Sequence, residues 1–76
     1  MTEQHKVTLF TEYIELFKLL KRENISASGG EAKYLVSEGY VSVNGTPETR
    51  KRRKIRPGDV VECFDVQLVV VKNADE

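Results

Sequence analysis

Six of the twelve Lys and Arg residues lie within seven positions, in the run Arg50-Lys51-Arg52-Arg53-Lys54-Ile55-Arg56. Because the formal net charge of the chain is zero, this positive charge is a local excess. Concentrated like charges repel one another, and a polyanion offsets that repulsion most directly. Arg can bind a phosphate through two parallel hydrogen bonds, whereas Lys acts more as a point charge. The run alone leaves two interpretations open: a nucleic-acid contact, or a solvated loop or nuclear-import signal.

A second candidate site lies at the start of a predicted helix, in Ser28-Gly29-Gly30-Glu31. The Ser-x-x-Glu spacing is typical of a capping box, in which Ser28 accepts from the amide of Glu31 and Glu31 accepts from the amide of Ser28. Gly29 and Gly30 leave backbone amides uncovered, and such amides attract phosphate. An ordinary capped helix with a tight turn is the alternative, and Glu31 adds negative charge there. Three cationic residues are candidates to join this site: Lys33, Lys21 and Arg22.

Two tyrosines, Tyr34 and Tyr40, could stack on bases. Tyr34 falls outside the apolar stripe of its predicted helix, so we expect it to be partly exposed. Tyr40 opens a predicted strand. Packing within the fold is the alternative role for both rings.

The residue inventory gives catalysis little support. His5 is the only histidine and Cys63 the only cysteine, so no Ser/His/Asp or Cys/His set and no zinc site of several thiolates can be built. We expect Cys63 to be a small buried hydrophobe and His5 to lie in a frayed N-terminus. The chain is therefore predicted to be no enzyme and to need no metal, cofactor or small-molecule substrate. The acids are scattered and each has a structural explanation: Glu12, Glu15, Glu31, Glu38 and Glu48.

Helical periodicity dominates the first half of the chain. A short strand is possible at 7–10, and Thr11 could then cap a helix at 12–23 whose charge order suits the helix dipole. Ile25 should fold back to the core. A second helix at 29–38 carries a narrow apolar stripe and ends at Gly39, which suits a left-handed conformation. The apolar positions of the two helices are Tyr13, Leu16, Phe17 and Leu20, and Ala32, Leu35 and Val36.

The second half switches to alternating patterns. Asn44-Gly45 predicts a tight turn between a strand at 41–43 and an edge strand at 46–49. Pro57-Gly58-Asp59 predicts another turn, followed by strands at 60–63 and 66–71, with Ile55 anchoring the basic run between the turns. The predicted fold is α+β, with two short N-terminal helices packed on a small, mainly antiparallel sheet.

The length and hydropathy of the chain predict its domain organisation and location. With 76 residues, the chain should form one domain, 1–76, with a core at about 12–71, a flexible N-terminus and an unstructured tail at 72–76. We find no apolar run long enough for a membrane span and no signal-peptide pattern. We therefore expect a soluble cytoplasmic protein, and a monomer.

The segment 28–45 carries the pattern Glu-Gly-x-Val-x-Val-Asn-Gly, and Pro57-Gly58-Asp59-Val60-Val61 follows downstream. This combination resembles the S4 (S-four) RNA-binding domain, also called the alpha-L motif, over about 13–71. The resemblance implies an RNA-binding module in which the start of helix two and the following hairpin region face structured RNA. It carries over to Ser28, Lys33 and the basic segment after Thr49. Many relatives have Arg directly after the position of Ser28, where this chain has Gly29 and Gly30. That Gly-Gly form and the basic run are similar to small stand-alone bacterial members.

We therefore expect a non-catalytic protein that binds structured RNA, most plausibly ribosomal RNA, with a role in ribosome assembly or translation. Two other classes stay open. One is a protein-interaction module whose basic run meets an acidic partner. The other is a DNA-binding protein, although the second helix offers only Lys33 for reading a major groove.

Overall fold

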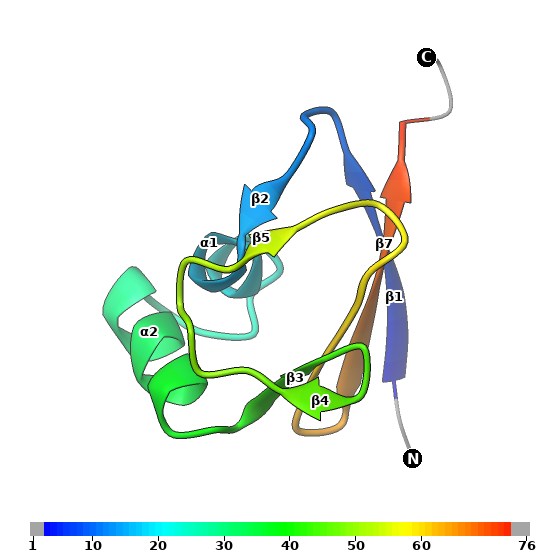
Figure 1. Cartoon of the computed structure of the whole chain (residues 1–76). Coiled ribbons are helices and arrows are strands. Elements are labelled where there is room, and N and C mark those ends of the chain that lie inside the picture. Colours follow the sequence, from blue (N-terminus) through cyan, green and yellow to red (C-terminus); the bar gives the residue numbers. More distant parts are fainter. Residues whose placement is uncertain (1–2, 74–76) are drawn as a thin grey trace.

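A computed structural model describes residues 3–73 of the chain. Its main element is a mixed five-stranded sheet in which the first and last strands of the chain lie side by side and run parallel (Figure 1). The other neighbouring strands of this sheet pair antiparallel. In spatial order the strands are β1 (Glu3–Leu9), β7 (Val66–Lys72), β6 (Val60–Cys63), β3 (Val41–Val43) and β4 (Thr46–Pro47).

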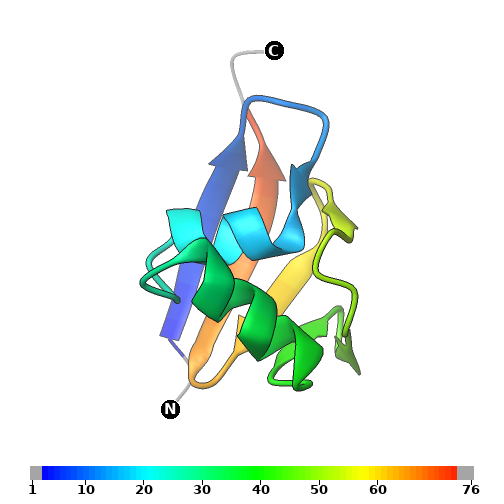
Figure 2. The same ribbon diagram turned by 90° about the vertical axis from the view of Figure 1, so that its left-hand side faces the viewer.

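Two short helices cover one face of this sheet, as the view in Figure 2 shows. Alternating strand positions and one stripe on each helix meet between the two layers, and they bury most of the apolar side chains that the sequence pattern indicates. Tyr13 is the exception, since it precedes α1 and is exposed, and Phe17 is only partly buried. A separate two-stranded sheet lies beside the first helix. The remaining elements are α1 (Leu16–Arg22), α2 (Gly29–Ser37), β2 (Ile14–Glu15) and β5 (Lys54–Ile55).

The predicted fold class is confirmed, and the predicted turns lie where their residues indicate. Asn44 and Gly45 both have positive φ, 53° and 84°, as a tight hairpin turn requires. Gly39 ends α2 with a φ of 81°. Ile55 is fully buried, and Ile25 packs against the core. Cys63 is buried as expected, and this burial raises the pKa of its thiol.

The first helix begins later than predicted. Residues 14–15 form β2, and α1 starts at Leu16 instead of residue 12. Thr11 does not cap this helix, since its hydroxyl donates to the carbonyl of Tyr13. The physical reason is tertiary: β2 pairs with β5, which lies about forty residues further along the chain. No local pattern reports such a pairing.

The N-terminal strand begins earlier than predicted, at Glu3 instead of residue 7. Residues Glu3–Leu9 form a seven-residue strand, so His5 lies within β1. Val7 and Leu9 belong to the core, outside the expected range of 12–71. Among residues 3–73, the only strand that pairs with β1 is β7, at the far end of the chain. The short alternating pattern of β1 alone therefore indicated the strand only weakly. At the other end Lys72 still belongs to β7, while residues 74–76 of the predicted tail lie outside the described residues.

Two smaller predictions need correction. The edge strand β4 ends at Pro47, so Glu48 and Thr49 are not part of it. In the capping box, Ser28 accepts from the amide of Glu31 as predicted, at 3.1 Å. The Glu31 carboxylate, however, accepts from the amide of Ala27 at 3.4 Å, one residue before the predicted partner.

Candidate nucleic-acid interface

The residues 48–56, hereafter the basic loop, are fixed to the first helix by their backbone. The amide of Leu16 donates to the carbonyl of Arg53 at 2.9 Å, and that of Phe17 donates to the carbonyl of Lys51 at 3.0 Å. The first amides of a helix lack partners within the helix, and α1 has no side-chain cap. The carbonyls of the basic loop accept hydrogen bonds from these amides instead. Pairing of Ile14 with Ile55 completes the attachment.

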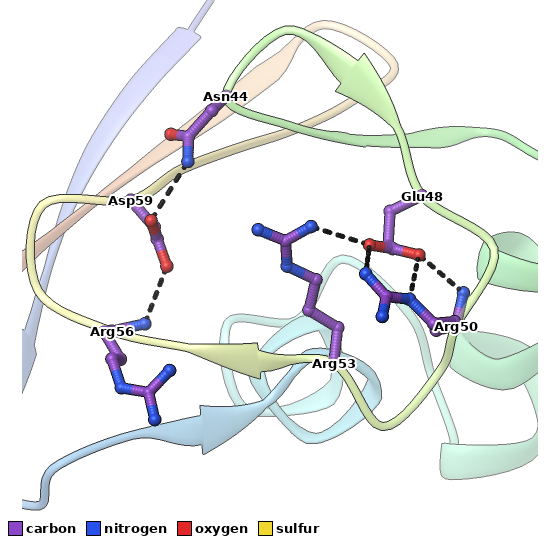
Figure 3. Close-up of polar contacts among 6 residues, drawn as sticks. All are labelled: Asn44, Glu48, Arg50, Arg53, Arg56 and Asp59. Carbon is purple, nitrogen blue, oxygen red and sulfur yellow. Dashed lines mark hydrogen bonds and ion pairs between the residues drawn. The ribbon is translucent and has the colours of Figure 1, made fainter.

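One carboxylate organises the first half of the basic loop (Figure 3). The buried Glu48 side chain accepts from the amide, Nε and Nη2 of Arg50, each at 3.0 Å, and from Nη1 of Arg53 at 2.8 Å. These donors, Arg50 first and then Arg53, hold the pKa of Glu48 well below its ordinary value, against the opposing effect of burial. The Glu48 carboxylate thus holds residues 48–53 in one conformation, and it offsets part of the charge of two arginines.

A second carboxylate holds the other end of the loop. Asp59 accepts from the amide of Arg56 at 2.8 Å and from Nδ2 of Asn44 at 3.0 Å (Figure 3). The Oδ1 of Asn44 accepts in turn from the amide of Val60 at 2.9 Å. These hydrogen bonds join the β3–β4 turn to the turn after the basic loop, and they fix the position of the end of the loop.

The basic side chains gather on one surface. They line a shallow concavity, and no acidic side chain is among its lining residues. Since Glu48 and Asp59 bind the loop from within, the cationic groups stay on the outside. Such a surface suits phosphate groups. The lining residues are Arg50, Arg52, Arg53, Lys54 and Arg56.

The half-buried ring of Phe17 joins this surface to the second helix. The Nζ of Lys33 lies 4.9 Å from the ring centroid, and the guanidinium carbon of Arg52 lies 5.9 Å from it. The Nζ of Lys18 is also 5.9 Å away. These distances are within reach of cation–π attraction. Phe17 thus connects cations of α1, α2 and the basic loop, although Glu15 also pairs with Lys18 at 3.0 Å and Arg52 at 3.7 Å.

The start of α2 keeps its backbone open. A Cβ built on Gly29 would meet nothing within 4 Å, and one on Gly30 would meet only the Ser28 hydroxyl, at 3.9 Å. Packing therefore does not demand glycine at either position. The Gly-Gly pair leaves amides accessible on the helix that carries Lys33, while the Glu31 carboxylate stays close by.

Other predicted residues make no contact with this surface. Arg22 donates to the carbonyl of Thr8 on β1, at 3.1 Å. Lys21 and Tyr34 are exposed, without a contact to the basic loop among residues 3–73. Tyr40 lies against Phe64 instead. Lys51 takes part through its carbonyl, and its side chain is exposed outside the concavity.

Two residues of the interface were missed from the sequence. Glu48 was dismissed as a scattered acid, although it is the only acid between Glu38 and Asp59 and stands directly before the basic run. That isolation was an available signal. Phe17 was assigned to the apolar helix face, and its contacts with cations from two other segments had no local signal.

Within the described residues, no group of three or more His, Cys, Asp or Glu side chains could hold a metal ion. In the same part of the chain, no helix has the length and apolar character needed to span a membrane.

Two helices meeting beside a basic loop, on a small sheet, define the alpha-L class of RNA-binding domain. The family model for the S4 domain matches residues 7–72, and the chain belongs to that family.

Two relatives are similar to this chain over most of their own length. The chain is 51% identical over 59 residues to "Putative RNA-binding protein YbcJ" of Escherichia coli (strain K12), covering 78% of this chain and 84% of that protein. It is 45% identical over 56 residues to "Probable ribosome maturation protein RlbA" of Bacillus subtilis (strain 168), covering 74% and 79%. The solution structure of E. coli YbcJ, described as having an alpha-L motif involved in RNA binding, matches with a TM-score of 0.65 at 42% identity over 91% of each chain.

Proposed function

We propose that this protein is a non-catalytic RNA-binding protein that holds structured RNA against the basic loop and the start of α2. The observation that carries the proposal is the concavity lined by five basic side chains and fixed from within by Glu48. A preorganised surface loses little freedom on binding and presents its cations in one shape. Because RNA helices are recognised mostly through backbone and shape, such a surface suits structured RNA.

The residues proposed to contact RNA extend from this concavity toward α2. Lys33 and Arg52 both lie within about 6 Å of the centre of the Phe17 ring, and this closeness supports one RNA backbone meeting both the loop and the helix. Ser28, Gly29 and Gly30 add backbone amides at the helix start. The proposed contacts in the loop are Arg50, Lys51, Arg52, Arg53, Lys54 and Arg56, and more distant candidates are Lys21, Arg22 and Tyr34.

Ribosomal RNA is the RNA we propose. The support is the name of the B. subtilis relative, a ribosome maturation protein, together with its 45% identity to this chain. A role in ribosome assembly or translation, in the cytoplasm and as a monomer, belongs to the same proposal.

The test compares three polyanions at physiological salt: a ribosomal RNA hairpin, a DNA hairpin of the same sequence, and heparin. The proposal expects the RNA hairpin to bind most tightly, with log affinity falling against log salt at a slope of about −3 to −4. Equal binding of heparin would contradict it in favour of a module for acidic partners. Equal binding of the DNA hairpin would favour a DNA-binding protein.

A further inference from the structure

Two aromatic rings stand exposed at the end of the sheet opposite the turn that follows the basic loop (Figure 1). Tyr40 and Phe64 are 52% and 67% exposed, and their ring centroids lie 5.8 Å apart. Tyr40 directly precedes β3, and Phe64 directly follows β6, where Val41 pairs with Cys63. Figure 1 shows this β6–β7 turn at the lower end of the sheet, whereas the turn after the basic loop lies at the other end of β6.

The fold gains little from Phe64. Its φ is 56°, a left-handed conformation that is unfavourable for a residue with a Cβ. It is the first central residue of a two-residue hairpin loop, and it alone of the two has positive φ, a position where Gly is favoured. An exposed ring also gains little from burial. The left-handed backbone disfavours Phe at this position, and burial of the ring does not compensate for it. The presence of Phe therefore points to a role outside folding.

The charges beside this pair are acidic. Glu38 precedes Tyr40 by two residues, Glu62 precedes Phe64 by two, and Asp65 follows it directly. Across residues 3–73, none of the three acidic side chains forms an ion pair or a side-chain hydrogen bond. Between Lys33 and Arg50, and between Arg56 and Lys72, the chain contains no Lys or Arg. No ion pair therefore offsets these three carboxylates in the described part of the chain.

We infer that Tyr40, Phe64, Glu38, Glu62 and Asp65, the aromatic–acidic patch, form a docking site for an Arg- or Lys-rich segment of a partner protein. Aromatic faces attract guanidinium and ammonium groups, and exposed aromatic residues are frequent anchors of protein interfaces. The unpaired carboxylates complement a basic partner and repel the phosphates of RNA. The patch thus differs in charge from the proposed RNA surface, although the basic loop begins close to it, where the amide of Glu48 donates to the carbonyl of Val41 at 2.9 Å. The inference does not depend on the RNA proposal.

The test is an NMR titration of the ¹⁵N-labelled full chain with a short Arg-rich peptide and with the same peptide carrying citrulline in place of Arg. We expect saturable shifts centred on Tyr40, Phe64 and Asp65 with the Arg peptide and none with the citrulline peptide. Phe64→Asn removes the ring and suits the left-handed backbone. It should weaken peptide binding about ten-fold or more, while its urea midpoint equals or exceeds that of the original chain. Phe10→Ser is the control, because Phe10 is also exposed, at 72%, outside the patch.

Several results would overturn the inference. These are shifts spread evenly over all exposed acids, peptide binding unchanged in Phe64→Asn, or a lower urea midpoint in that variant. Shifts of the patch that grow with protein concentration in the absence of peptide would assign it to a second copy of this chain. Loss of hairpin RNA binding in Phe64→Asn would assign the patch to RNA. Failure of RNA binding by the original chain leaves this test intact, since its readout is the peptide.

Discussion

The Oε1 of Glu48 and the Nη1 of Arg53 lie 2.8 Å apart, which ties a buried carboxylate to the middle of the basic loop. Arg50 shares the same carboxylate through its amide and its guanidinium. The acid that reduces the charge of the loop is therefore also the group that gives the loop its shape. If net charge alone governed RNA affinity, removing the Glu48 carboxylate would tighten binding. If the ordered shape of the loop governs it, the same change would weaken binding.

Replacing Glu48 with Gln should weaken RNA binding, although it makes the chain more positive by one charge. The variant loses charge-assisted hydrogen bonds worth about 1–3 kcal/mol of unfolding free energy, and the loop loses its fixed form. Urea unfolding and hairpin RNA affinity measure the two effects. Glu38→Gln is the control, because it removes one exposed negative charge at the end of α2, outside the basic loop. Tighter RNA binding by Glu48→Gln would show that charge alone matters.

The stabilisation by Glu48 should depend on pH. Its pKa is lowered on folding from an ordinary value of 4.5, mainly by hydrogen bonds from Arg50 and Arg53. A carboxyl of this kind stabilises the folded state fully above its unfolded pKa, and the stabilisation is lost as the pH falls toward the folded pKa. The difference in unfolding free energy between the original chain and Glu48→Gln should stay constant above about pH 6 and shrink below about pH 4.5. A difference that is the same at pH 7 and pH 3 would contradict this.

Phe17 should couple Lys33 to the basic loop. Phe17→Leu keeps an apolar side chain of similar volume, so unfolding should change by less than about 1.5 kcal/mol. Without the ring, Lys33 and Arg52 lose their shared contact, and RNA affinity should fall several-fold. A double-mutant cycle with Lys33→Gln, read out as RNA affinity, should give a coupling of about 0.5–1 kcal/mol. Strictly additive effects would mean that Lys33 acts independently of Phe17.

Gly29→Arg should be tolerated and should tighten RNA binding. A side chain at Gly29 meets open space, and the change adds a cation at the start of α2, beside the proposed phosphate contact. Stability should stay within about 1 kcal/mol, since improved helix propensity offsets the unfavourable dipole at this end. Gly39→Arg is the contrast, because the φ of 81° at Gly39 strains any residue with a Cβ and should destabilise the fold. Weaker RNA binding by Gly29→Arg would indicate that the bare amides themselves are required.

Locally encoded features were predictable from the sequence. Ser28 caps α2, Asn44-Gly45 turns the hairpin and Ile55 anchors the loop, each through contacts that short-range chemistry can anticipate. Features that depend on distant pairing were not. β1 exists because of β7, and the late start of α1 reflects the pairing of β2 with β5. Glu48 is a different case, because its donors Arg50 and Arg53 lie only two and five residues away, so local reasoning could have found its role.

The basic residues of the loop differ in whether they contact Glu48, and this difference decides which of them can be substituted to test RNA binding. Reversing Arg50 or Arg53 would break the Glu48 network, so loss of binding would not separate contact from folding. Arg52 and Lys54 are exposed and line the concavity without contacting Glu48. Lys6 and Lys72 are equally exposed and lie on β1 and β7. The two pairs therefore offer equal changes in net charge at different places.

The most direct measurement is the affinity of hairpin ribosomal RNA for the double variants Arg52→Gln/Lys54→Gln and Lys6→Gln/Lys72→Gln, across a range of salt. The account predicts that the loop pair loses about ten-fold or more in affinity, with a salt slope shallower by about 1.5, while the β1/β7 pair retains affinity within about three-fold. Both variants should unfold at the same urea concentration as the original chain. Equal losses in the two folded variants would contradict a contact surface at the basic loop.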